Sequence, residues 1–201
     1  MMMRKMSDMK MKYWNAPVYT FHHGFDQVAS IFYDRYPNSY AVHVISEDVI
    51  ERRITENYVY TKKLIVKKGS SFIQKMPGWL WRAVPARFGD ALKMETVPTL
   101  EESIYDRQNK TLTTYTRNVS CTNLFFMDER CRYFPAKDPT KTESIRELKL
   151  GVMGFNGAFT YTVEKVLAMA FKKSVHKTYM GFEEKLGQRF GLPPHHTLSE
   201  K

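Results

Sequence analysis

The sequence predicts an α+β fold in which a long C-terminal helix closes one curved, largely antiparallel sheet of about seven strands. Through most of the chain, short stretches of alternating apolar and polar residues follow one another, as in strands. The C-terminal part instead carries apolar residues at helical spacing. With 201 residues, of which 43% are hydrophobic, the chain can bury one substantial core but hardly two. A helix lying over the concave face of a sheet can enclose a cavity.

The first elements are a strand and a short helix. Residues 12–20 alternate as a strand does, and Gly24 then opens the helix. We expect Pro37 to end it, because the residue before a proline avoids the helical conformation. The apolar face of this helix is formed by Phe25, Val28, Ala29, Phe32 and Tyr36.

The remaining strands are expected to pair mostly as antiparallel neighbours. The polar triplet Thr55-Glu56-Asn57 predicts a hairpin turn between the first two of them. Pro98 requires an edge, a bulge or a break in the third, because proline has no N–H for a sheet ladder. These strands cover residues 42–54, 58–68, 92–105, 110–120, 124–134 and 143–150.

Residues 72–88 break the alternating pattern and are interpreted as a lid with a short helix. Aromatic and basic residues gather here between Pro77, Gly78 and Pro85. Indole rings at head-group depth beside cations are typical of an interfacial membrane contact, so we favour that role over a loop packed in the core. The predicted membrane-contact residues of the lid are Met76, Trp79, Leu80 and Trp81.

The last element is a helix from Ala158 to Phe190, which Gly191 and the following prolines end. Residues 12–190 therefore form one domain, preceded by a disordered leader over 1–11 and followed by a tail over 191–201. The broad apolar face of this helix contains Phe159, Val163, Val166, Leu167, Ala170, Phe171, Val175, Phe182 and Leu186.

The two cysteines, Cys121 and Cys131, are separated by nine residues. In the predicted hairpin, Cys121 lies near the turn while Cys131 lies opposite Thr114, too far away for disulfide geometry. Both are therefore expected to be structural thiols.

The net charge of +10 and the pI near 9.5 favour an acidic partner, either an anionic lipid surface or a nucleic acid. No apolar run reaches 18 residues, so any membrane contact is expected to be peripheral. The run K/R-G-F/Y-G/A-F-V-x-F/Y, typical of one class of RNA-binding sheet, is absent. This absence makes the nucleic-acid module the weaker alternative.

Basic residues in two elements predict a hollow for an anionic head group. Arg35 follows the first helix, and lysines lie on both faces of the strand over 58–68. We expect too few carboxylates nearby to pair with them. The alternative for that strand is an edge position with solvated lysines. The long helix adds a stripe of Ala170, Lys173, Ser174 and Lys177, for which a solvated basic face is an equal alternative.

No constellation for catalysis or metal binding stands out. The motifs H-E-x-x-H, C-x-x-C and G-x-S-x-G do not occur, and the six histidines have no evident catalytic partner in sequence. Gly151, Gly154 and Gly157 fit neither phosphate-loop pattern and are interpreted as a strand-to-helix turn. We therefore expect no enzyme activity, no metal and no cofactor.

Several segments together resemble the PRELI/MSF1 domain family. They run in the family's order from about residue 12 to residue 186. The segments are Arg35-Tyr36-Pro37-Asn38 with His43-Val44 and Glu47-Asp48, Lys63-Leu64-Ile65-x-Lys67, Met76-Pro77-x-Trp79, Thr113-Thr114-Tyr115-Thr116-Arg117-Asn118, Asp128-Glu129-Arg130-Cys131, and Phe171-x-x-Ser174-Val175-x-Lys177-x-x-x-Gly181.

The resemblance implies a START-like fold around a lipid cavity covered by a lid. It also implies a carrier that moves phosphatidic acid or phosphatidylserine in the mitochondrial intermembrane space, as a heterodimer with a small twin-cysteine helical protein. The family positions that line the head-group end of the cavity correspond here to Arg35, His43, Lys63, Lys67 and Lys177.

Two features bear on which lipid is carried. Lys67 favours phosphatidic acid, because the phosphatidylserine-type relatives tend to lack a lysine there. Ala170 and Ser174 depart from the family pattern, in which a basic residue and an asparagine occupy these helix positions. The sequence therefore predicts a phosphatidic acid transfer protein, with a phosphatidylserine carrier and a non-transferring adaptor as alternatives.

Overall fold

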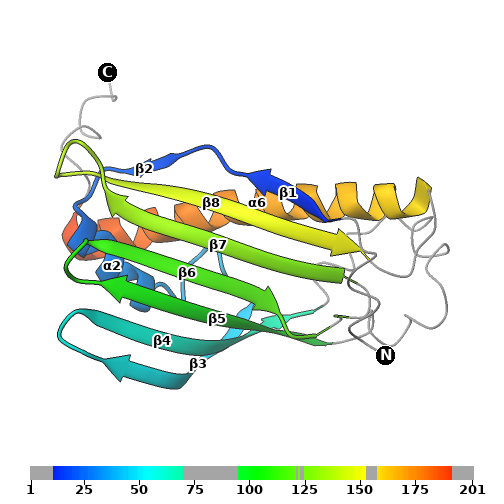
Figure 1. Cartoon of the computed structure of the whole chain (residues 1–201), viewed down its shortest axis with the longest axis horizontal. Helices are drawn as coiled ribbons and strands as arrows, with labels where there is room; N and C mark the ends of the chain where they lie inside the picture. The colour runs from blue at the N-terminus through cyan, green and yellow to red at the C-terminus, as the bar shows by residue number, and fades with distance from the viewer. Residues whose placement is uncertain (1–10, 70–94, 121, 123–124, 153–157, 192–201) are drawn as a thin grey trace.

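A computed structural model shows one curved sheet with a long helix lying across its concave face (Figure 1). It describes residues 11–69, 95–120, 122, 125–152 and 158–191. The parts outside these residues are the predicted leader except for its last residue, most of the tail, most of the glycine turn, and the lid with Met76, Trp79, Leu80 and Trp81. The same holds for Cys121.

The sheet has eight strands, and all of its pairings are antiparallel. Its order is β1-β8-β7-β6-β5-β4-β3, and β2 also pairs with β8. The predicted α+β, START-like architecture with a long closing helix is therefore confirmed. The strands are β1 (Lys12–Asn15), β2 (Tyr19–Phe21), β3 (Val44–Ile54), β4 (Tyr58–Lys68), β5 (Thr96–Asp106), β6 (Thr111–Asn118), β7 (Phe125–Pro135) and β8 (Thr142–Val152).

One more strand is present than the sequence predicted, because the segment 12–20 is divided. β1 pairs with β8 from Lys12 to Asn15 and β2 pairs with it from Tyr19 to Phe21. Pro17 lies between them and cannot donate to a ladder. The expectation for Pro98 is met, because β5 pairs with β6 only from Thr99 onward and is locally an edge at Pro98.

The first helix, α2 (Phe25–Tyr33), is shorter than predicted and does not include Tyr36. Asp34 donates its N–H to the Ile31 carbonyl, which closes the last turn before Pro37 is reached. The side-chain amide of Asn38 then donates to the Arg35 carbonyl at 2.7 Å. Residues 34–43, here called the lip, therefore form a connection stabilised by its own hydrogen bonds.

The closing helix, α6 (Ala158–Phe190), has the predicted limits. Its C-terminal half packs on the sheet through buried Phe171, Val175, Tyr179, Phe182 and Leu186. The Phe182 ring stacks on Tyr133 of β7 at 5.7 Å between ring centroids. For the predicted face residues Phe159, Val163 and Val166, the side chains are outside the described part.

The predicted position of Cys131 is confirmed. It pairs across the ladder with Thr114, and it is a buried free thiol. Burial raises the pKa of this thiol, although Arg146 acts in the opposite direction.

No described helix is long and apolar enough to cross a membrane.

Candidate functional site

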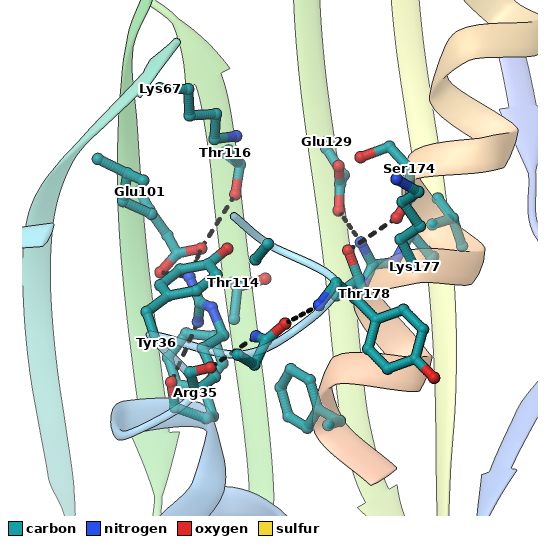
Figure 2. A pocket seen from close by; sticks show the side chains of 18 of the residues that line it. Arg35, Tyr36, Lys67, Glu101, Thr114, Thr116, Glu129, Ser174, Lys177 and Thr178 are labelled. Carbon is teal, nitrogen blue, oxygen red and sulfur yellow. Dashed lines mark hydrogen bonds and ion pairs between the residues drawn. The ribbon is translucent and has the colours of Figure 1, made fainter. Parts of the chain in front are cut away.

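The candidate site is a pocket between the concave face of the sheet, the lip and α6 (Figure 2). It contains about 790 Å³ of space that no atom fills, part of which is open to solvent. Four of the five predicted head-group residues line it, namely Arg35, His43, Lys67 and Lys177. The structure therefore brings together side chains from the lip, from β4 and from α6.

The fifth predicted residue, Lys63, is not among the lining residues. It is 3% exposed, and its ammonium donates to the Glu47 carboxylate of the edge strand β3 at 2.8 Å. The same carboxylate lies 3.9 Å from the Arg35 guanidinium. Lys63 thus lies beside the pocket on the same face of the sheet, near the Phe32 and Tyr33 rings of α2.

Arg35 is buried and paired with a carboxylate. Its Nη2 donates to both Glu101 oxygens at 2.7 Å, and its Nη1 donates to the Phe32 carbonyl at 3.1 Å. Burial alone would lower the pKa of this guanidinium, but the charges of Glu101 and Glu47 outweigh it and raise that pKa. Arg35 is therefore a charged group in a neutralised environment.

A second buried ion pair lies on the opposite side of the pocket. Arg146 of β8 donates to Glu129 of β7, and its guanidinium lies over the Tyr179 ring at 5.2 Å. Burial opposes the charge of Arg146, but Glu129 outweighs it and the pKa is raised. Both residues line the pocket.

The carboxylates of both pairs, Glu101 and Glu129, belong to a polar row that crosses the sheet in register. Lys63 on β4 lies opposite Glu101 on β5, and Glu101 lies opposite Thr116 on β6. Thr116 in turn lies opposite Glu129 on β7. Directly opposed residues project to the same face, so these side chains form one polar band on the concave side.

Two sequence-based expectations about this charge are wrong. Nearby carboxylates are not scarce, since Glu47, Glu101 and Glu129 pair with the buried cations. Nor is β4 an edge strand, because β3 and β5 flank it. Sequence reasoning missed Glu101, Glu129 and Arg146 as pocket residues. Period-two alternation can put Glu101 and Glu129 on one face of their strands, but it does not show which cations they meet.

Lys67 and Lys177 differ from the buried cations. Lys67 is partly exposed and Lys177 is exposed, and neither has an ion pair with a carboxylate among the described residues. The lining contains four side chains with a permanent positive charge, Arg35, Lys67, Arg146 and Lys177, against the carboxylates of Glu101 and Glu129. The difference of two positive charges resides on these lysines. They are the groups available to an anion.

The basic stripe of α6 divides between pocket and solvent. Ser174 and Lys177 line the pocket, as does Thr178. Lys173 is exposed and is not among the lining residues, so the solvated-face alternative fits it. Ala170 is half-buried and also lies outside the lining.

Gly181 of α6 allows the lip to approach the helix closely. A Cβ at this position would lie 2.7 Å from the Asn38 side-chain oxygen. Ser39 also donates to the Glu184 carboxylate from both its N–H and its hydroxyl. The glycine of the sequence motif is therefore explained by a contact that closes one side of the pocket.

The architecture places this chain in the START-like class of folds. It is similar to the crystal structure of the Zhui aromatase/cyclase from Streptomyces sp. R1128, with a TM-score of 0.54 and 12% identity over 91% of this chain and 100% of that one. At this identity the likeness concerns the fold alone. No described group of histidine, cysteine and acidic side chains could hold a metal ion.

The sequence comparisons give a more specific assignment than the fold class. The model of the PRELI-like family matches residues 26–191, and the chain belongs to this family. It is 35% identical to the human protein named PRELI domain-containing protein 1, mitochondrial, over 87% of this chain and 75% of that protein. It is 30% identical to Protein UPS1, mitochondrial, of Saccharomyces cerevisiae, over 78% of this chain and 83% of that protein.

Proposed function

We propose that this protein carries a phospholipid between mitochondrial membranes, and that its ligand is phosphatidic acid. The observation that carries the proposal is the pair of lysines, Lys67 and Lys177, without carboxylate partners in the described part of a pocket that is otherwise neutralised. A phosphate group is the complement of two such ammonium groups. The mitochondrial names of the relatives support the location, and the intermembrane space is part of the proposal.

The proposed mechanism is non-covalent, and the protein is not an enzyme in this account. The head group enters between the lip and α6, and its phosphate meets the two lysines. Each charge-assisted hydrogen bond to the phosphate contributes about 1.5 to 3 kcal/mol, which offsets the desolvation of the ammonium groups. The acyl chains follow along the concave face toward Phe159, Val163 and Val166.

The lid and a partner complete the proposal. Trp79 and its neighbours are proposed to insert shallowly into an anionic membrane while basic side chains meet the lipid phosphates. Docking should therefore weaken as salt rises, since the surface potential is screened over roughly 10 Å at 0.1 M salt. A small twin-cysteine helical protein is proposed as the partner that keeps the carrier folded.

Transfer of phosphatidic acid between donor and acceptor liposomes tests the function. Lys67→Glu reverses one charge at the pocket and is expected to lower the transfer rate at least about tenfold. Lys173→Glu is the matched control, because Lys173 lies on the exposed side of α6 outside the pocket lining. Equal transfer by the Lys67→Glu variant and the wild type would refute the head-group assignment. A transfer rate insensitive to both salt and Trp79→Ala would remove the lid from the mechanism.

A further inference from the structure

We propose that Arg35 and Glu101 are positioning residues whose ion pair fixes the lip of the pocket, while Lys67 and Lys177 alone supply the charged contacts to the head group. The family resemblance puts Arg35 among the positions that line the head-group end of the cavity. The geometry points to a different role for it, and identifies Glu101 as its partner. Only the part of this inference that assigns the head-group contacts to Lys67 and Lys177 rests on the proposed function.

The guanidinium of Arg35 is already committed within the protein. It donates to Glu101 and to the Phe32 carbonyl, and it lies over the rings of Phe32 and Tyr36 at 4.4 and 4.8 Å. Only 4% of the residue is exposed. A phosphate could take the Nη2 group of this guanidinium only by separating it from Glu101.

Such a separation would be unfavourable on both sides. Glu101 is 6% exposed, so it would become an unpaired buried carboxylate. It would also lie next to the incoming phosphate, which carries the same sign of charge. Lys67 and Lys177 present no such conflict, because neither is paired with a carboxylate in the described part of the chain.

A series of contacts also connects the ion pair to α6 on the other side of the pocket. The Arg35 carbonyl accepts from the Asn38 side chain, whose oxygen accepts from the Tyr40 N–H at 3.0 Å. Asn38 then packs against Gly181 of α6. In Figure 2 the lip runs from the side of Glu101 across to the helix that carries Lys177. Fixing Arg35 on β5 therefore fixes the distance between the sheet and the lip, whose Tyr40, Ala41 and His43 line the pocket.

A double-variant cycle separates positioning from direct binding. The probe is short-chain phosphatidic acid, and its dissociation constant is measured with the full-length protein. Arg35→Gln leaves the Glu101 carboxylate unpaired beside the phosphate, so the affinity should fall about tenfold. In Arg35→Gln/Glu101→Gln, two amides can still hydrogen-bond and no charge is left unpaired, so the affinity should return to within about threefold of wild type. If Arg35 binds the phosphate directly, the double variant will be as weak as Arg35→Gln, and the proposal fails.

Two controls accompany the cycle. Lys62→Gln/Glu102→Gln removes a more exposed ion pair between β4 and β5, at a separation of 4.0 Å, whose carboxylate is next to Glu101 in sequence. It should leave the affinity unchanged. Lys67→Gln should weaken binding by the same factor in the wild type and in the Arg35→Gln/Glu101→Gln background, since it acts independently of the ion pair.

Hydrogen–deuterium exchange tests the positioning role without any ligand. Exchange in a peptide covering residues 38–44 should be at least about fivefold faster in Arg35→Gln than in wild type, because the lip loses its attachment to β5. The control Lys62→Gln/Glu102→Gln should leave it unchanged. Unaltered exchange in Arg35→Gln would overturn the positioning role. Absence of phosphatidic acid binding by the wild type, with faster lip exchange in Arg35→Gln, would instead refute the proposed ligand and retain the positioning role.

Discussion

Two groups of cations lie at the pocket, one buried and one at its mouth, here defined by Lys67 and Lys177. They differ in burial and in their carboxylate partners. Arg35 and Arg146 in the pocket and Lys63 beside it are at most 6% exposed, and each donates to a carboxylate. Lys67 and Lys177 at the mouth are more exposed, and neither has a carboxylate partner among the described residues. The same side-chain chemistry therefore stabilises the fold in one region and remains available for a ligand in the other.

This difference shows that a buried cation is not by itself evidence of a ligand site. An unpaired buried charge is costly, and a protein can remove that cost with an internal carboxylate as well as with a bound anion. The carboxylates of Glu47, Glu101 and Glu129 do so here. The cations that have no carboxylate partner among the described residues are the better candidates for a ligand site.

The largest expected effect of a substitution lies in the interior. Arg146→Leu leaves the partly buried Glu129 carboxylate without its cation and should lower the free energy of unfolding by up to about 3–5 kcal/mol. Urea denaturation followed by circular dichroism measures it. Arg146→Leu/Glu129→Leu should recover most of this loss, because no charge remains unpaired. A loss below about 1 kcal/mol in Arg146→Leu would erase the contrast between interior and mouth.

The next effect concerns the contact that joins the lip to α6. Gly181→Ala places a methyl group against the Asn38 side chain, which is held by the Arg35 carbonyl and the Tyr40 N–H. The unfolding free energy should fall by about 1–3 kcal/mol, the usual cost of overpacking. Asn38→Ala removes the obstacle, so the two substitutions together should cost clearly less than the sum of their separate effects. Strict additivity would show that the two side chains do not meet.

At the mouth, stability should hardly change. Lys67→Gln/Lys177→Gln removes two partly or fully exposed charges without a carboxylate partner in the described part, so the unfolding free energy should stay within about 0.5 kcal/mol of wild type. The same urea experiment measures it. If the unfolding free energy fell as much as in Arg146→Leu, these lysines would stabilise the fold as the buried cations do.

The smallest effect is expected at a surface ion pair far from both regions. Hydrogen bonds from Thr140, together with Lys141, lower the pKa of Asp138 from 3.8 to about 2. A depressed carboxylate pKa adds stability that is complete above the ordinary pKa and is lost as the pH falls through the lower value. The stability difference between wild type and Asp138→Asn should thus be constant from about pH 5 to 7 and shrink between about pH 4 and 2. A difference that grows on acidification would contradict the assignment.

Much of the fold follows from local patterns in the sequence. The limits of α6 and β4 were predicted correctly, because helical spacing and alternation persist through the whole of each element. The two errors occurred where a proline acts at a distance of a few residues. Pro17 divides the first strand, and the helix before Pro37 ends three residues earlier than Tyr36.

The candidate site was predictable only in part. The family resemblance singled out Lys67 and Lys177, and both line the pocket. The pairing of Arg35 with Glu101 was not foreseeable, because it joins residues 66 positions apart through the register of β5. Electrostatic neutralisation depends on distances of a few ångströms, which a one-dimensional pattern does not contain.

Native mass spectrometry of the purified protein tests the central claim, that the two mouth lysines hold an anionic phospholipid. We expect the wild-type protein to retain phosphatidic acid in a one-to-one ratio. The Lys67→Gln/Lys177→Gln variant should be equally folded but should carry at least about tenfold less of this lipid. A folded double variant that retains as much of this lipid as the wild type would contradict the account.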